Sequence, residues 1–195
     1  MICRREIEKR LKAIRPRRLK DQYSGEAAVL IGLVERKGRL LLLLTRRTED
    51  VATHKGQISF PGGMREAGDT SPVDTALRET REELGVYPGA IQVVGEFHEY
   101  LAVTDQKVRC IVGYIDPEVD YHPQLDEVAY ILEVPIEFFA ETQPRVDQRF
   151  RQGRVQNVYF FDFNGEDIWG LTARIIRDFV EFLKLEPKDC SLGMD

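Results

Sequence analysis

The chain has 195 residues, 43% of them hydrophobic and 31% charged, with a formal net charge of −5. This length fits one compact domain, and the acidic balance argues against general nucleic-acid binding, which favours a basic surface. No apolar run approaches the ~20 residues that a membrane-spanning helix needs, so we expect a cytoplasmic protein without a membrane segment. The cysteines are widely scattered and suggest neither a disulfide framework nor a zinc site: Cys3, Cys110 and Cys190.

The first residues form a basic segment, which we take as an N-terminal arm over residues 1–22. Residues 1–20 hold nine Lys or Arg and two Glu, a balance of +7 that leaves −12 for the rest of the chain. Ile7, Leu11 and Ile14 recur at helical spacing, which predicts an amphipathic helix docked on the domain with its basic side in solvent. The composition fits neither a transit peptide nor a secretory signal. An arm that binds phosphate or a partner remains an alternative.

The rest of the chain predicts strands interleaved with helices, in a domain over residues 23–185 followed by a flexible tail over 186–195. Apolar runs at 27–35 and 40–45 flank Lys37-Gly38, which is typical of a hairpin. Further elements are predicted in chain order: strands at 91–102 and 107–115 around a turn at 104–106, a strand at 128–134 entering a short helix at Pro135, strands flanking Gln152-Gly153, and a final helix with Leu171, Ile175, Ile176, Phe179, Phe182 and Leu183 on one face.

A glycine turn and a well-marked helix occupy residues 62–86. Ser71 suits the N-cap, Pro72 the first helical position, and Asp74 the acidic position of a capping box. Gly85 supplies the C-terminal stop. Apolar residues at helical spacing form the face expected to pack inward: Val73, Ala76, Leu77 and Leu84.

The same helix carries three carboxylates on one patch. Glu79, Glu82 and Glu83 are spaced three and four apart, so their like charges oppose folding unless a cation neutralises them. Mg²⁺ or Mn²⁺ prefers such oxygen ligands and commonly bridges them to phosphates. A charged run by itself is more often a solvated face. The F-P-G-G turn at residues 60–63, whose glycines let the backbone approach a ligand closely, favours the metal site.

This segment resembles the Nudix box, whose family pattern is G-x5-E-x7-R-E-U-x-E-E-x-G-U, with U a bulky aliphatic residue. The matching residues are Gly63, Arg78, Glu79, Glu82, Glu83, Gly85 and Val86. Two positions differ. Asp69 stands where the first family Glu would be, one residue further from Arg78, and Thr80 occupies the first aliphatic position. The resemblance implies a Nudix-type α/β/α sandwich with a mixed sheet.

A narrower resemblance extends on both sides of the box. Residues 43–63, L-L-T-R-R-T-E-D-V-A-T-H-K-G-Q-I-S-F-P-G-G, are similar to the signature of the coenzyme A pyrophosphatase branch of the family. Residues 167–174, D-I-W-G-L-T-A-R, resemble the start of the last helix in that branch. Thr48 and Ala52 depart from the usual signature residues. The likeness spans most of residues 26–184.

The resemblance implies roles for the box residues. Glu79 and Glu83, with the Gly62 carbonyl, would hold the main metal, Mg²⁺ or Mn²⁺. Glu82, oriented by Arg78, would reach a metal directly or through water. A further carboxylate is expected from outside the box, as an additional ligand or general base. Glu127 is our leading candidate, and its rivals are Glu96, Glu99 and Glu118.

Basic residues upstream of the box are candidates for substrate contacts. Arg46, Arg47 and Lys55 could bind phosphates, although exposed basic side chains commonly have no specific partner. His54 could touch substrate or serve as a hydrogen-bonding scaffold. Trp169 could stack on an adenine, but its place beside an apolar helix favours a core position.

We therefore expect a metal-dependent pyrophosphohydrolase that cleaves coenzyme A or its thioesters to adenosine 3′,5′-bisphosphate and 4′-phosphopantetheine. The alternatives are the same chemistry on another nucleoside diphosphate derivative such as ADP-ribose, or a Nudix module that senses nucleotides without cleaving them. The expected partner is a small nucleotide of the coenzyme A kind rather than a nucleic acid or a membrane, and a homodimer would be unsurprising.

Overall fold

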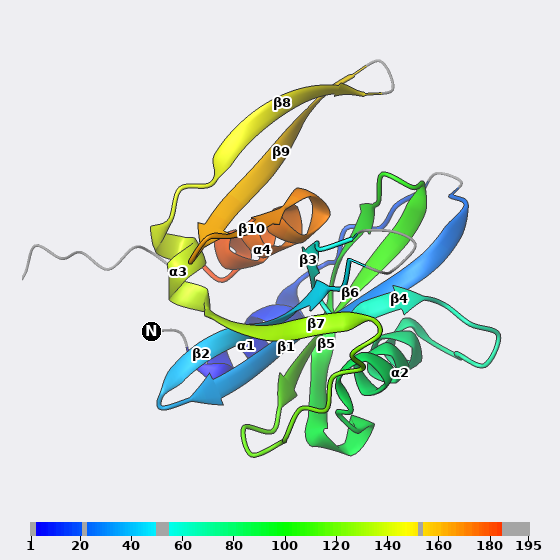
Figure 1. Cartoon of the computed structure of the whole chain (residues 1–195), viewed down its shortest axis with the longest axis vertical. Coiled ribbons are helices and arrows are strands. Elements are labelled where there is room, and N and C mark those ends of the chain that lie inside the picture. Colours follow the sequence, from blue (N-terminus) through cyan, green and yellow to red (C-terminus); the bar gives the residue numbers. More distant parts are fainter. Residues whose placement is uncertain (1–2, 21–22, 50–54, 152–153, 185–195) are drawn as a thin grey trace, which may run out of the picture.

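The computed structural model describes residues 3–20, 23–49, 55–151 and 154–184 (Figure 1). It contains helices α1 (Arg4–Ala13), α2 (Pro72–Leu84), α3 (Ile136–Glu141) and α4 (Gly170–Phe182), a 3-10 turn η1 (Pro88–Ala90), and strands β1 (Gly25–Arg36), β2 (Arg39–Arg47), β3 (Ile58–Ser59), β4 (Gly62–Met64), β5 (Ile91–Leu101), β6 (Gln106–Ile115), β7 (Val128–Pro135), β8 (Arg145–Arg151), β9 (Arg154–Phe163) and β10 (Glu166–Trp169). None of the described helices is both long and apolar enough to cross a bilayer.

The main sheet is mixed, as predicted. Its strand order is β3-β2-β1-β6-β5, with β4 also paired to β1 and β7 to β2. Strand β1 runs parallel to β6, while its pairings with β2 and β4 are antiparallel. A second, three-stranded antiparallel sheet has the order β10-β9-β8.

The main sheet has a separate apolar core on each face, because successive strand residues point to opposite sides. Ile31 and Leu33 of β1 belong to the core that includes Phe179 of α4 and buried residues of α1. Leu30 belongs to the other core, with Ala76 of α2. Helices therefore cover both faces of the sheet, which confirms the α/β/α sandwich.

The turns predicted at Lys37-Gly38 and around residues 104–106 form, but some strands were missed. The turn predicted at Gln152-Gly153 lies outside the described residues. Lys37 and Gly38 both have positive φ, 50° and 71°, which suits a tight hairpin. Strands β3 and β4 have two and three residues, too few to leave a periodic pattern. The prediction that residues 167–169 open the last helix is wrong. They belong to β10, which pairs with β9, and the helix begins at Gly170.

The basic N-terminal segment contains α1, whose apolar side faces the domain. Ile7 is fully buried and Leu11 nearly so. After the helix the chain runs beside β5, where the amide of Glu99 donates to the carbonyl of Arg17 at 3.0 Å. This contact covers part of the outer edge of β5. The predicted tail over 186–195 lies outside the described residues.

The second sheet extends from the body as the β8–β9 hairpin (Figure 1). At its base, Phe161 packs edge-on against Phe139 of α3, and Arg177 of α4 lies over the ring of Tyr159. Trp169 is half-buried and stacks on the ring of Phe160 at 5.9 Å. The base of the hairpin is thus held by aromatic packing.

Candidate active site

Helix α2 is fixed at both ends by its own sequence. The Ser71 hydroxyl accepts from the amide of Asp74 at 3.2 Å, and the Asp74 carboxylate accepts from the amide of Ser71 at 2.9 Å. Gly85 ends the helix in the left-handed conformation. Thr80, which replaces an aliphatic residue of the family pattern, is buried and donates its hydroxyl to the Ala76 carbonyl at 2.7 Å. Its polar group is therefore satisfied within the helix.

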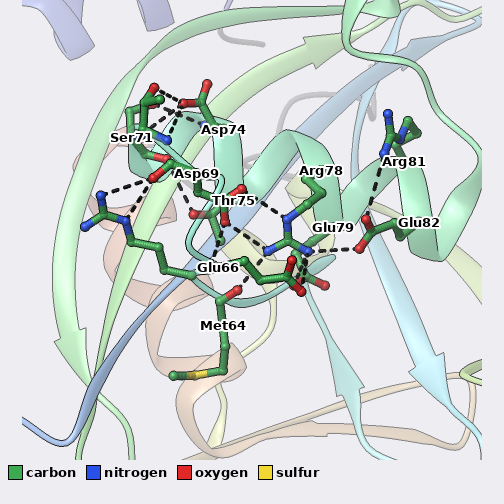
Figure 2. Close-up of polar contacts among 12 residues, drawn as sticks. Met64, Glu66, Asp69, Ser71, Asp74, Thr75, Arg78, Glu79, Arg81 and Glu82 are labelled. Atoms are coloured by element: carbon green, nitrogen blue, oxygen red, sulfur yellow. Dashed lines mark hydrogen bonds and ion pairs between the residues drawn. The ribbon is translucent and has the colours of Figure 1, made fainter.

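Arg78 is the centre of a hydrogen-bond network at the start of the carboxylate patch (Figure 2). Its guanidinium donates to both oxygens of Asp69, at 3.1 and 3.0 Å, and to the Met64 carbonyl at 2.8 Å. It also donates to Glu79 and Glu82, each at 2.9 Å. The hydrogen bonds from Arg78 hold the pKa of the Asp69 carboxyl well below its usual range. Asp69 therefore anchors the arginine that orients two predicted ligands.

The two glycines of β4 allow its close approach to the helix and to β1. A Cβ at Gly63 would lie 2.4 Å from Oε1 of Glu79. A Cβ at Gly62, whose φ is 154°, would lie 2.4 Å from the carbonyl oxygen of Ala28. Any larger residue would push the backbone away from the carboxylates. This explains physically why the predicted turn contains paired glycines.

Glu83 is a buried carboxyl with an incomplete set of partners. Only 4% of the residue is exposed, and its Oε2 has no hydrogen-bond partner among the described residues. Burial raises its pKa to about 8; Arg47 opposes the shift, whereas the negative charge of Glu79 adds to it. Burial also raises the pKa of Glu79. The site therefore penalises negative charge unless a cation enters.

The loop before β7 places Glu127 beside the box. The amide of Gln124 donates to the Glu83 carbonyl at 2.9 Å, which fastens this loop to the end of α2. The amide of Thr48 donates to the Glu127 carbonyl at 3.0 Å, which fastens it to the end of β2. Arg47 lies between the two acids, 3.5 Å from Oε1 of Glu83 and 4.0 Å from Oε2 of Glu127. The predicted extra carboxylate is thus brought next to the predicted ligands.

The rival carboxylates lie in other surroundings. Glu96 and Glu99 of β5 form ion pairs with Arg18, at 2.7 and 3.1 Å, and with Arg109, at 2.7 and 3.5 Å. Glu118 is exposed in the loop after β6. Their arginine partners leave Glu96 and Glu99 less free than Glu127 to meet a metal or water.

The basic candidates separate into different environments. Arg46 donates to Glu166 of β10 at 2.7 Å, whereas its neighbour Arg47 faces the carboxylates. Lys55 is exposed at the start of the segment leading to β3. His54 lies outside the described residues. Among the candidates that the structure describes, Arg47 is the one that lies beside the box.

The positions of the acidic side chains show whether the predicted metal ion could bind at this site. Within the described ranges, no three acidic, histidine or cysteine side chains converge as they stand into a metal-binding cluster. Arg78 engages Glu79 and Glu82, and Arg47 lies against Glu83. The unpartnered, buried oxygen of Glu83 and the mutual repulsion of the acids nevertheless fit a divalent cation. Such a cation would compete with the arginines for the carboxylates.

A surface hollow of about 410 Å³ adjoins this network on the side of the β1–β4 pairing. It is lined by Gly25 and Glu26 of β1, by residues 64–67, and by Asp69. The loop that holds Arg78 therefore forms one wall of a concave surface large enough to receive part of a small ligand.

Comparison with known proteins agrees with this geometry. The model of the NUDIX domain matches residues 24–154, which include the whole carboxylate helix and Glu127. The chain belongs to the Nudix hydrolase family. Enzymes of this family act on phosphorus anhydrides and generally use divalent metal ions such as Mg²⁺ or Mn²⁺.

Similar Nudix proteins cover nearly the whole chain. A protein of Citrobacter koseri described as "uncharacterized Nudix hydrolase NudL" is 35% identical over 176 residues, 87% of this chain and 91% of its own length. A protein of the same description from Pectobacterium atrosepticum is 38% identical over 152 residues, 77% of this chain and 79% of its own. A MutT/nudix family protein from Enterococcus faecalis has the same fold, with a TM-score of 0.52 at 16% identity over 95% of this chain and 73% of that one.

Proposed function

We propose that this Nudix hydrolase cleaves the diphosphate of coenzyme A or its thioesters, releasing adenosine 3′,5′-bisphosphate and 4′-phosphopantetheine. The supporting observation is that the two segments resembling the coenzyme A pyrophosphatase branch lie together. Arg46, in the first segment, forms an ion pair with Glu166, directly before the second. Strand β3 of the first segment also lies against β10 of the second. We place this reaction in the cytoplasm, in agreement with a substrate that is a small nucleotide.

The charged residues near the Nudix box have distinct roles in the proposed hydrolysis. Mg²⁺ or Mn²⁺, held by Glu79, Glu82, Glu83 and the Gly62 carbonyl, would supply charge neutralisation at the diphosphate and activation of water. Arg78 keeps Glu79 and Glu82 in place through its hydrogen bonds. Glu127 is half-exposed and stands beside the ligands, where it can accept a proton from water or join the ligand set.

Arg47 is the group best placed to meet the diphosphate. Its Nε is buried without a hydrogen-bond partner among the described residues, and its contacts with the two acids, at 3.5 and 4.0 Å, are long. A guanidinium offers five donors in a fork that matches phosphate oxygens. An arriving diphosphate would accept from the terminal guanidinium nitrogens, whose contacts with the acids are long.

A substrate panel tests the proposal. Metal-free protein would be supplied with Mg²⁺ or Mn²⁺ and offered coenzyme A, dephospho-coenzyme A, ADP-ribose and a nucleoside triphosphate at equal concentration. We expect kcat/KM to fall by roughly tenfold or more without the 3′-phosphate, about 1.4 kcal/mol, and further for ADP-ribose. Mass spectrometry should find adenosine 3′,5′-bisphosphate and phosphopantetheine. Faster hydrolysis of ADP-ribose would instead select the alternative substrate class, and binding without hydrolysis of any compound would select a sensing module.

A second experiment separates the two roles of Glu127. If it is the base, Glu127→Gln removes a titrating limb from the pH dependence of kcat and leaves metal affinity similar. If it is a ligand, the variant chiefly raises the metal concentration at half-maximal rate. If Glu127 holds either role, Glu118→Gln should change neither quantity. An unchanged Glu127→Gln enzyme would instead transfer the role to Glu96, Glu99 or Glu118.

A further inference from the structure

Strand β8 leaves one edge of the smaller sheet open. It is the last strand in the order β10-β9-β8, and none of the described helices or strands lies on its outer side in Figure 1. One face of the hairpin also exposes apolar side chains: Val146 at 46%, Phe150 at 77% and Val155 at 61%. Phe150 and Val155 are directly opposite each other in the β8–β9 pairing. An open edge with exposed apolar side chains commonly receives another strand.

The sequence of this edge is complementary to itself in the antiparallel direction. Residues 146–150 read Val-Asp-Gln-Arg-Phe. If two copies pair about a two-fold axis at Gln148, Val146 of each copy stands opposite Phe150 of the other. In the same register Asp147 of each copy stands opposite Arg149 of the other, and the two Gln148 side chains meet. Every one of the five positions thereby gains a favourable cross-strand neighbour.

We propose that β8 is a homodimer interface, in which two copies join their smaller sheets edge to edge into one continuous sheet. The same patch of each copy contacts the other, as a two-fold interface requires. Phe150 would lie between Val155 of its own chain and Val146 of the second copy, so each of these exposed side chains would gain an apolar neighbour on the same face of the joined sheet. Backbone hydrogen bonds between the two β8 strands supply the association, as in other cases of strand addition.

Other registers are unfavourable. A two-fold axis at Asp147 would set two aspartates opposite each other, and one at Arg149 would set two arginines opposite each other. Within one copy Asp147 also accepts from Arg145 at 2.7 Å, an exposed contact that leaves room for a second arginine. The next pair outward would place Arg145 opposite Arg151, so the ladder is confined to residues 146–150. So short a ladder predicts a reversible dimer whose population depends on concentration.

Charge exchange provides the test. Sedimentation velocity over about a hundredfold range of protein concentration should show the wild type passing from monomer to dimer. Asp147→Arg and Arg149→Asp should each weaken association at least tenfold, because each sets like charges opposite each other twice. An equimolar mixture of these two variants should recover association, since every 147–149 pair is then of opposite charge. The double variant should associate like the wild type.

Matched controls keep the result specific to β8. Asp120→Arg makes the same charge change as Asp147→Arg at an exposed loop position and should leave the dimer intact. Circular dichroism should show every variant folded. A wild type that stays monomeric, an Asp147→Arg variant that associates as strongly as wild type, or a mixture that stays monomeric would each overturn the proposal.

Discussion

Replacing Glu83 with glutamine should stabilise the metal-free protein at alkaline pH while removing its activity. The buried carboxyl has its pKa raised to about 8, against 4.5 in an exposed chain. Between these pH values the folded state keeps a proton that the unfolded chain releases. The stability of the metal-free protein therefore falls as pH rises from about 4.5 to about 8. Glutamine resembles the protonated carboxyl and carries no such penalty.

The size of this stability change follows from the raised pKa of Glu83. Each pH unit inside this window changes the free energy of unfolding by about 1.4 kcal/mol, so from about pH 5.5 to pH 8.5 the advantage of Glu83→Gln over wild type should grow by an amount on the order of 3 kcal/mol. The variant also loses the charge that would hold the cation. Its kcat should fall at least ~10²-fold, because metal electrostatics contribute several kcal/mol to such transition states.

Urea unfolding of EDTA-treated protein at the two pH values measures this difference. Glu82→Gln on the same helix is the control, because its half-exposed side chain stays hydrated and should show no comparable gain. Adding Mn²⁺ should stabilise the wild type more at the higher pH than at the lower, and Glu83→Gln much less at both. A difference between variant and wild type that is the same at both pH values would falsify the assignment of a strained, buried charge to Glu83.

Three further predictions concern the surroundings of the site. Gly63→Ala places a Cβ 2.4 Å from the carboxylate of Glu79 and should weaken Mn²⁺ binding measured by calorimetry, while Gly68→Ala, where a Cβ meets nothing within 4 Å, should not. Ser71→Ala removes half of the capping box and should cost about 1 kcal/mol in urea unfolding with the activity of the folded enzyme kept; no loss of stability would contradict the cap. Arg47→Met should tighten Mn²⁺ binding in calorimetry, because it removes a positive charge that competes with the metal for the carboxylates. It should also raise KM, because it removes a hydrogen-bond donor to the substrate phosphates. Weaker Mn²⁺ binding would contradict the proposed competition between Arg47 and the metal.

The local features of the site follow from the sequence by itself. The cap at Ser71, the stop at Gly85 and the convergence of Glu79, Glu82 and Glu83 depend on helical spacing alone, and the pair between Arg78 and Glu82 does too. Helical geometry is the same in any protein, so these positions could be predicted without tertiary contacts. The hairpin turn at Lys37-Gly38 and the mixed α/β class could also be predicted, because turns and periodic apolar patterns depend on residues that are close together in the sequence.

The tertiary structure decides which residues from other parts of the chain lie beside helix α2. Glu127 reaches the box because its loop is hydrogen-bonded to the ends of α2 and β2, and Asp69 is identified as the anchor of Arg78 only in three dimensions. Arg46 and Arg47 are neighbours in sequence, yet one pairs with Glu166 and the other faces the carboxylates. The sequence cannot separate such residues, because successive side chains of a strand point to opposite faces and the pairing register decides which face meets the site.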